Sequence, residues 1–306
     1  MNAPAIELSG IVKRFGEIEA VRGVDLTVAP GRTFGLIGHN GAGKSTLFRI
    51  MLGLIAPSSG TLRLFGEPAE GARFRELRRT IGYLPEHFAL YDNLSGLETL
   101  RFYARLKGAA QTECIAALER VGLAEAANRK VRGYSKGMRQ RLGFAQALLG
   151  KPRLLFLDEP TNGLDPQAIH DFYEIIGALK AEGTTVILTS HILAEIEQRV
   201  DEVAILREGR VVARGSVTEL RDAVELPARI ELRVATHARD ALVSFLHARG
   251  HACQTINGHH LSLSLRREER LPLLATLASQ DGVQDLRIVE PSLEAVFLEH
   301  SQESRP

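Results

Sequence analysis

Short apolar blocks recur along this chain, and their spacing alternates between two periods. Residues 34–37 form a strand-like apolar run, and the apolar positions of residues 47–54 then recur at i, i+3, i+4 and i+7. Residues 154–157 and 184–190 form two further apolar runs. Continuous apolar runs are typical of parallel strands buried on both faces, and the longer period is typical of amphipathic helices. The alternation predicts an α/β fold built on a parallel sheet.

Other segments predict smaller layers beside that sheet. Residues 6–8 and 18–28 have the pattern of strands and are expected to form an antiparallel layer. Residues 202–215 predict a hairpin that turns at Glu208-Gly209. Further helices are expected at residues 97–106, at residues 114–121 and along an apolar face made of Met138, Leu142, Ala145 and Leu149.

The last quarter of the chain predicts a second domain. The helix at residues 217–224 is expected to end the first domain, and Pro227 marks a boundary that divides the chain into residues 1–225 and 226–306. The elements that follow have the order β-α-β-β-α-β, a ferredoxin-like pattern, and a last helix comes after them. No residue set in this α+β domain has a catalytic pattern, so we expect a regulatory or dimer-bracing role.

Composition narrows the class of protein. The chain has 306 residues, of which 44% are hydrophobic and 25% are charged, and its formal net charge is +1. The lack of a basic excess disfavours nucleic acid as a partner. No apolar stretch approaches the roughly 18–20 residues of a membrane span, and the N-terminus has no signal-peptide pattern. The two cysteines, Cys114 and Cys253, fit a reducing cytoplasm.

A glycine-rich segment carries the strongest chemical signal. Residues 38–46 read GHNGAGKST and match the pattern G-x-x-x-x-G-K-[ST]. In this pattern backbone N–H groups surround a phosphate, Lys44 reaches the outer phosphates, and the Ser45 hydroxyl can bind Mg²⁺. The alternative is a strand-to-helix turn without a ligand. The candidate nucleotide-binding residues are Gly38, His39, Asn40, Gly41, Ala42, Gly43, Lys44, Ser45 and Thr46.

Acidic and imidazole groups follow two of the predicted strands. Asp158 and Glu159 end the run at residues 154–157, and His191 ends the later run. The carboxyl ends of parallel strands present ligand-binding groups. Asp158 is placed to hold Mg²⁺, Glu159 to activate the attacking water, and His191 to contact a phosphate oxygen. The candidate catalytic residues are Glu159, His191 and Lys44. The alternatives are a solvated strand end and a structural histidine.

A second predicted helix start also has the features of a phosphate site. Ser135, Lys136 and Gly137 precede the helix and supply a hydroxyl, a small residue and the positive end of a helix dipole. One chain needs a single such site for its own nucleotide. The second site therefore suggests contact with a nucleotide that another copy of the chain holds.

The order of the motifs GHNGAGKST, YSKGMRQ, LLFLDEPTNGLDP and TSH resembles the nucleotide-binding subunit of ABC transporters, over about residues 5–220. The resemblance implies a P-loop NTPase with an antiparallel β subdomain and a helical subdomain at about residues 86–150. It implies ATP and Mg²⁺ as cofactors, and a head-to-tail dimer that encloses two ATP molecules. It adds Phe15 as the ring that stacks on adenine, and Asp165 as a further cofactor-site residue in the loop that communicates across the dimer. The residues that match the family signature are Ser135, Lys136, Gly137, Met138 and Arg139.

Two departures from the family pattern bear on the chemistry. The signature reads YSKGM, in which Tyr134, Lys136 and Met138 replace leucine, glycine and glutamine, while Ser135 remains. In the segment IGYLPEH, Glu86 stands where the family usually has a glutamine that touches Mg²⁺ and reports to the membrane subunit. A carboxylate would bind the metal as a charged ligand. The alternative is that Glu86 is a solvated loop residue.

The segment after Glu86 is unusually apolar for a loop, with Phe88, Leu90, Tyr91 and Leu94. One interpretation is a docking groove for integral membrane subunits, and the other is packing inside the helical subdomain; both can hold at once. The family resemblance implies a peripheral location, on the inner face of the bacterial cytoplasmic membrane.

Two framework segments narrow the resemblance. Residues 93–110 and 134–150 resemble the ATPase subunit of the nitrous oxide reductase maturation transporter, the NosF type, which supports assembly of a periplasmic copper centre. This implies a role in copper-centre assembly, with a periplasmic assembly protein as a further partner. The alternatives are the ATPase of a drug, lipid or polysaccharide exporter, and a soluble ABC ATPase that never meets a membrane. The sequence has no long coiled-coil insertion or second cassette, which disfavours the soluble class.

A cluster of potential metal ligands lies in the predicted second domain. His251, Cys253, His259 and His260 flank a predicted turn. Their spacing is not that of a structural zinc site. A soft-metal site and a set of exposed histidines are the two interpretations, and the second is favoured.

Overall fold

The computed structural model describes residues 3–190, 192–224, 226–257 and 259–302. It divides the chain into two compact units, Met1–Ser216 and Val217–Pro306, which are described separately below. The division falls before helix α8 (Val217–Ala223) rather than at residues 225–226. The reason is packing, because α8 contacts α11 (Leu293–Gln302), and Arg221 Nε donates to the Pro291 carbonyl oxygen at 2.7 Å.

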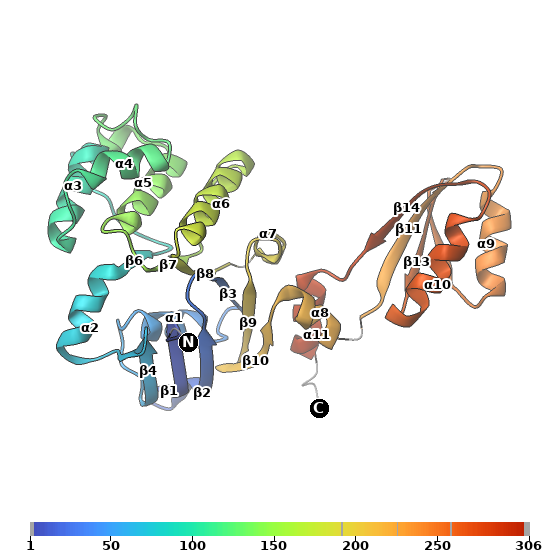
Figure 1. Ribbon diagram of the computed structural model, residues 1–306, viewed down its shortest axis with the longest axis horizontal. Coiled ribbons are helices and arrows are strands. Elements are labelled where there is room, and N and C mark those ends of the chain that lie inside the picture. The colour runs from blue at the N-terminus through green and yellow to red at the C-terminus, as the bar shows by residue number, and fades with distance from the viewer. Residues whose placement is uncertain (1–2, 191, 225, 258, 303–306) are drawn as a thin grey trace. The chain divides into compact units, whose positions relative to one another are not determined.

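The first unit is built on a six-stranded sheet of order β10-β9-β3-β8-β7-β6 (Figure 1). All neighbouring pairs are parallel except β9 and β10, which form the predicted hairpin. Every residue of β3 and β8 is buried, as the continuous apolar runs predict. The strands are β3 (Thr33–Ile37), β6 (Ile81–Leu84), β7 (Leu154–Asp158), β8 (Thr185–Thr189), β9 (Glu202–Arg207) and β10 (Arg210–Gly215).

A smaller antiparallel sheet of order β2-β1-β4-β5 confirms the predicted β layer. Helix α1 (Lys44–Met51) packs its buried face into one core that joins this layer to the main sheet, through residues such as Val24, Phe48 and Phe156. Leu54 was expected on the same helical face, but α1 ends earlier and Leu54 is 57% exposed. The strands are β1 (Ile6–Phe15), β2 (Ile18–Val28), β4 (Ser59–Leu64) and β5 (Glu67–Pro68), and α2 (Gly71–Leu77) follows them.

The predicted helical region forms α3 (Gly96–Lys107), α4 (Glu113–Arg120) and α5 (Lys136–Leu148). These three helices pack on one another. In Figure 1 they lie above the main sheet, and the β layer lies below it. Helices α6 (Pro166–Ala181) and α7 (Leu193–Glu197) follow β7 and β8. Throughout the described ranges, every helix is too short or too polar to cross a lipid bilayer.

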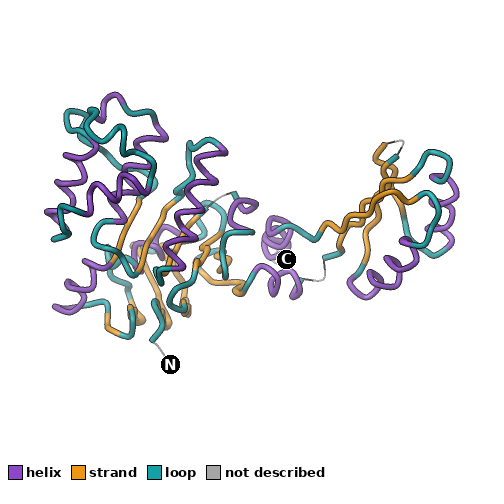
Figure 2. The backbone as a smooth tube through the Cα atoms, turned by 45° about the horizontal axis from the view of Figure 1, so that its top comes forward, coloured by secondary structure: helices purple, strands orange, loops and turns teal. Residues whose placement is uncertain are grey.

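The second unit has the predicted order β-α-β-β-α-β. Its antiparallel sheet has the strand order β12-β13-β11-β14, and helices α9 and α10 lie on one face of that sheet (Figure 2). Alternate residues of β11, including Ile230 and Leu232, face a core that Leu246, Leu261 and Leu277 complete. The elements are β11 (Ala228–Val234), α9 (Arg239–Ala248), β12 (Cys253–Asn257), β13 (His260–Leu265), α10 (Arg267–Ala278) and β14 (Val283–Val289).

A capping box fixes the start of α3, a helix that exposes the apolar side chains Phe102 and Leu106. Ser95 Oγ accepts from the Glu98 N–H at 3.2 Å, and the Ser95 N–H donates to Glu98 Oε2 at 2.6 Å. Ser95→Ala is expected to lower the free energy of unfolding by about 1 kcal/mol, because it leaves a helix N–H without its acceptor. Urea denaturation measures the loss. Ser95→Thr should retain most of the stability, because threonine keeps the hydroxyl. The control Ser264→Ala changes an exposed serine and should retain all of the stability. Equal losses in the three variants would contradict the capping role.

Candidate functional site

The glycine-rich segment forms the predicted strand–loop–helix. It leaves the buried strand β3 and ends where α1 begins at Lys44, with Gly43 as the residue before the helix. Gly41 and Gly43 have φ angles of 84° and 98°, which side chains disfavour. The first N–H groups of a helix lack intrahelical acceptors, so the start of α1 directs donors and the positive end of its dipole toward the loop.

Three neighbours, Ala20, Leu206 and Gly209, support the loop from behind. A Cβ atom on Gly38 would lie 2.5 Å from the Leu206 carbonyl oxygen, and one on Gly43 would lie 2.5 Å from the Ala20 carbonyl oxygen. The Gly209 N–H donates to the Ala42 carbonyl oxygen at 2.9 Å. Strand β2 and the β9–β10 turn therefore confine the loop, and glycine is required at both close approaches.

Lys44 lies over its own loop. Its Nζ donates to the carbonyl oxygens of Gly38 at 2.5 Å and His39 at 3.1 Å. Burial lowers the pKa of Lys44, and the carboxylates of Glu159 and Asp158 act in the opposite direction. Strand register gives the geometric reason: β3 pairs with β8 and β8 with β7, so the phosphate loop and the acidic pair leave the same edge of the sheet.

The acidic pair lies at the carboxyl end of β7, where one hydroxyl contacts both residues. Thr189 Oγ1 donates to Asp158 Oδ1 at 2.7 Å and accepts from the Glu159 N–H at 3.0 Å. Thr189 ends β8 and is 1% exposed. It falls inside a predicted strand, but no local sequence feature marks it, because its role depends on the pairing of two strands. His191, the predicted phosphate contact, lies outside the described residues.

The predicted second helix start also forms. Ser135 is the N-cap of α5, and its Oγ accepts from the Met138 N–H at 3.2 Å. Ser135 and Lys136 are exposed, so the hydroxyl proton and the ammonium group are available at the surface. A hydrogen bond that the sequence did not predict ties this helix to the main sheet, because the buried Gln140 donates through Nε2 to the Pro160 carbonyl oxygen at 2.9 Å.

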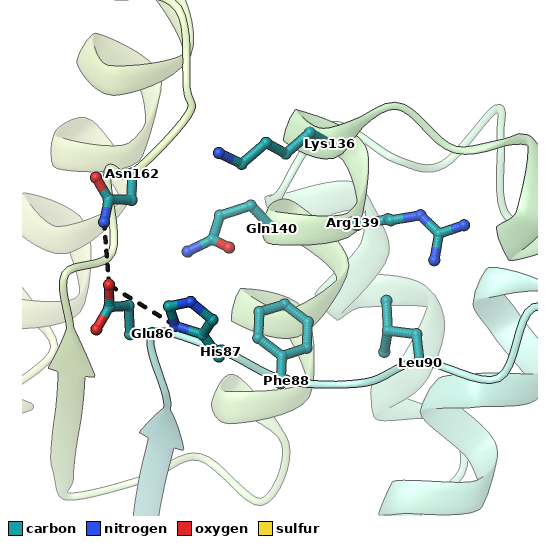
Figure 3. A pocket seen from close by; sticks show the side chains of 8 residues that line it. All are labelled: Glu86, His87, Phe88, Leu90, Lys136, Arg139, Gln140 and Asn162. Atoms are coloured by element: carbon teal, nitrogen blue, oxygen red, sulfur yellow. Dashed lines mark hydrogen bonds and ion pairs between the residues drawn. The ribbon is translucent and has the colours of Figure 1, made fainter.

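Glu86 lies in a cavity of about 450 Å³ between the loop after β6, α5 and the loop after β7 (Figure 3). Its Oε1 accepts from Asn162 Nδ2 at 3.5 Å and lies 3.7 Å from His87 Nδ1. Lys136 and Gln140 project from α5 toward Glu86 and Asn162, whereas Arg139, which also lines the cavity, points away from Glu86 (Figure 3). The cavity therefore gathers a carboxylate, an amide and a cation at a boundary between two parts of the first unit.

Two further predicted residues have identifiable surroundings. The Phe15 ring is 50% exposed at the end of β1, with Lys13 Nζ 5.2 Å from its centroid. The turn that holds Phe15 leads into β2, whose Ala20 adjoins the phosphate loop. Asp165 is the N-cap of α6 and accepts from the Ala168 N–H at 2.8 Å, so its carboxylate has a structural role in the single chain.

The oxygen ligands near the loop are those that Mg²⁺ prefers. Ser45 is exposed in the first turn of α1, and Asp158 ends β7, which β8 separates from β3 in the sheet. Mg²⁺ is usually held by one or two carboxylates together with substrate phosphates and water, so a protein cage is not needed. Accordingly, no three His, Cys, Asp or Glu side chains converge on a metal site in the described part of the chain. That finding covers His251, Cys253, His259 and His260, no three of which come together as a group of potential metal ligands.

Comparisons with known proteins agree with this geometry. The family model described as ABC transporter matches residues 21–162. An uncharacterised ABC transporter ATP-binding protein of Synechocystis is 37% identical over 94% of this chain and 80% of its own length. The daunorubicin resistance ATP-binding protein DrrA3 of Streptomyces coeruleorubidus is 34% identical over 100% of this chain and 98% of its own length.

A solved structure shares the fold of the first unit. It is the dimeric post-hydrolysis state of the ATP-binding cassette MJ0796 bound to ADP and Pi, at 25% identity and a TM-score of 0.63. The match covers 69% of this chain and 98% of that one. The chain spans from 62% to 98% of the length of curated relatives that it matches.

Two glycines of the loop allow a matched test of its confinement. Both have positive φ, but a Cβ atom on Gly41 meets nothing within 4 Å, whereas one on Gly43 meets the Ala20 carbonyl oxygen. Gly41→Ala is expected to cost about 1 kcal/mol of unfolding free energy from backbone strain alone. Gly43→Ala should cost about 1–3 kcal/mol more, because β2 must move. Urea denaturation without nucleotide measures both, and equal losses would show that β2 does not confine the loop.

Proposed function

The chain belongs to the ATP-binding subunits of the ABC transporter family and is an ABC ATPase, and we propose that two copies of it hydrolyse ATP to drive a pair of membrane subunits. The observation that carries this proposal is the parallel register of β3, β8 and β7, which brings the phosphate loop with Lys44 and the pair Asp158 and Glu159 to one edge of the main sheet. Phosphoryl transfer needs a cation at the outer phosphates, a metal ligand and a group that orients water, and these three residues supply them.

In this mechanism the chain's own residues position the phosphates and the water. The loop amides and Lys44 hold the β- and γ-phosphates, and Ser45, Asp158 and Glu86 would bind Mg²⁺. Bound Mg²⁺ would supply charge neutralisation at those phosphates. Glu159 accepts a proton from the attacking water, and His191 contacts the γ-phosphate. Phe15 stacks on the adenine ring, which its exposed position permits.

A second copy completes each site. The exposed start of α5, with Ser135, Lys136, Gly137 and Met138, has no nucleotide of its own to bind, and a head-to-tail partner would present one. The dimeric MJ0796 cassette supports the association. In this arrangement Asp165 and its loop lie near the partner, and closure and reopening of the dimer drive the membrane subunits between two states.

An apolar groove beside the Glu86 cavity is the proposed docking site for the membrane subunit. The groove has a volume of about 430 Å³, and exposed Tyr91, Phe102 and Leu106 lie at or near it. Burial lowers the pKa of Lys107, which lines the groove, to about 8. Phe88 both lines the groove and packs on Gly143, so both interpretations of this segment apply to it. Docking here would place the chain on the inner face of the cytoplasmic membrane.

Two cargo classes follow from different observations. The resemblance of residues 93–110 and 134–150 to the NosF type favours copper-centre assembly for nitrous oxide reductase, with a periplasmic assembly protein in the complex. The full-length similarity to a daunorubicin resistance protein favours the alternative of a drug exporter. The ATPase site serves both classes equally, since fold and motor do not specify cargo.

Glu159→Gln tests the assigned base. ATP binding should persist while phosphate release falls at least about 100-fold, because a neutral amide cannot accept the proton of the water. The variant should also accumulate as a dimer with ATP, which size-exclusion chromatography detects. The exposed Glu125→Gln is the control and should hydrolyse ATP as the wild type does. Substantial hydrolysis by Glu159→Gln would refute the assignment.

The same variant identifies the partners. Tagged Glu159→Gln, captured from native membranes with ATP, should retain a multi-span membrane protein, and Tyr91→Ser with Leu106→Ser should release it. Recovery of a periplasmic copper-assembly component as well supports the copper role, and a membrane subunit alone supports an exporter. Capture without a membrane protein would favour a soluble ABC ATPase.

Glu86→Gln tests the unusual carboxylate. The variant should bind ATP normally but change the turnover of the assembled complex, because a neutral ligand replaces a charged one near Mg²⁺ and beside the docking groove. Turnover is compared with and without the membrane subunit. Wild-type turnover in both states would show that Glu86 is a solvated loop residue.

A further inference from the structure

One buried hydroxyl links the two acidic residues of the site. Strands β7 and β8 pair in parallel register, with Asp158 opposite Thr189. Thr189 Oγ1 donates to Asp158 Oδ1 at 2.7 Å and accepts from the Glu159 N–H at 3.0 Å. The side chain is 1% exposed, so water does not compete for these bonds.

The chemistry of this position requires a hydroxyl. An ionised carboxylate only accepts hydrogen bonds, and a backbone N–H only donates them. The atom between them must therefore donate to one and accept from the other, which a serine or threonine oxygen does and a carbon cannot. Valine has nearly the shape of threonine but would leave the Glu159 N–H and Asp158 Oδ1 each without this partner.

The backbone of Glu159 adds a second reason for a fixed contact. Its φ of 48° lies in the left-handed region, which residues with a side chain disfavour. Such a conformation persists where surrounding bonds over-determine it. The Glu159 N–H bond to Thr189 and the Asn162 N–H bond to the Glu159 carbonyl oxygen, at 3.2 Å, hold the peptide on both sides.

We propose that Thr189 is a positioning residue that holds the proposed metal ligand Asp158 and the proposed base Glu159 in one fixed arrangement. The proposal rests on the function proposed above, because it assumes the roles of those two carboxylates. Thr189 itself touches neither nucleotide nor water in this mechanism. It acts by fixing the rotamer of Asp158 and the peptide orientation of Glu159, from which the glutamate side chain takes its direction.

The test compares Thr189→Val and Thr189→Ser with the wild-type full-length chain. Thr189→Val should lower kcat for ATP hydrolysis about 10–100-fold with little change in the KM for ATP. It should also raise the Mg²⁺ concentration needed for half-maximal activity. Thr189→Ser keeps the hydroxyl and should restore both quantities to within a few-fold of wild type.

Thr185→Val is the matched structural control. Thr185 lies on the same strand, is equally buried at 1% exposed, and its Oγ1 accepts from the Gly31 N–H at 2.9 Å, away from the acidic pair. Both valine variants should lose thermal stability, but only Thr189→Val should lose kcat. Equal kinetic losses in the two variants, or no rescue by Thr189→Ser, would overturn the proposal.

A binding measurement separates this proposal from the proposed function. Because the chain has no tryptophan, fluorescent MANT-ATP reports nucleotide binding, and Mn²⁺ electron paramagnetic resonance with a non-hydrolysable ATP analogue reports metal affinity. Thr189→Val should bind MANT-ATP as wild type does and bind Mn²⁺ about 10-fold more weakly. If wild type hydrolyses ATP, Glu159→Gln does not, and Thr189→Val keeps wild-type kinetics and Mn²⁺ affinity, only the positioning role fails. A wild-type chain that bound no MANT-ATP would overturn both.

Discussion

The parallel register of β3, β8 and β7 is the constraint on which the rest of the site depends. It places Leu36, the next-to-last residue of β3, opposite Thr189, and it places Thr189 opposite Asp158. Groups from three segments far apart in the chain therefore end at one edge of the sheet. A shift of one residue in any pair would turn the inward side chains to the other face and separate the lysine from the carboxylates.

Confinement of the phosphate loop is the second requirement. Loops with positive φ angles are flexible unless their surroundings hold them, and here β2 and the β9–β10 turn lie against Gly43, Ala42 and Gly38. The antiparallel layer thus has two roles: it completes the core around α1, and it fixes the shape that backbone N–H groups present to a phosphate. A preorganised donor set costs little further ordering when the ligand binds.

The boundary between the main sheet and the helical region is less tightly bonded. Gln140 to Pro160 is a buried hydrogen bond, but the Glu86 to Asn162 contact is long at 3.5 Å and borders a cavity of about 450 Å³. This boundary is held here by an exposed contact, and such regions are where local rearrangement costs least. It adjoins both the proposed metal ligand Glu86 and the proposed docking groove, which suits a part that transmits motion.

Local pattern in the sequence determined β3, β7, β8 and the β9–β10 hairpin, the phosphate loop, the capped start of α5 and the element order of the second unit, because each depends on spacing and residue type within a few positions. Tertiary structure alone decided that Thr189 lies between Asp158 and Glu159, that Ala20, Leu206 and Gly209 enclose the loop, and that α8 joins the second unit. These contacts join residues distant in the chain. Their partners are set by strand register and packing, which no local period encodes.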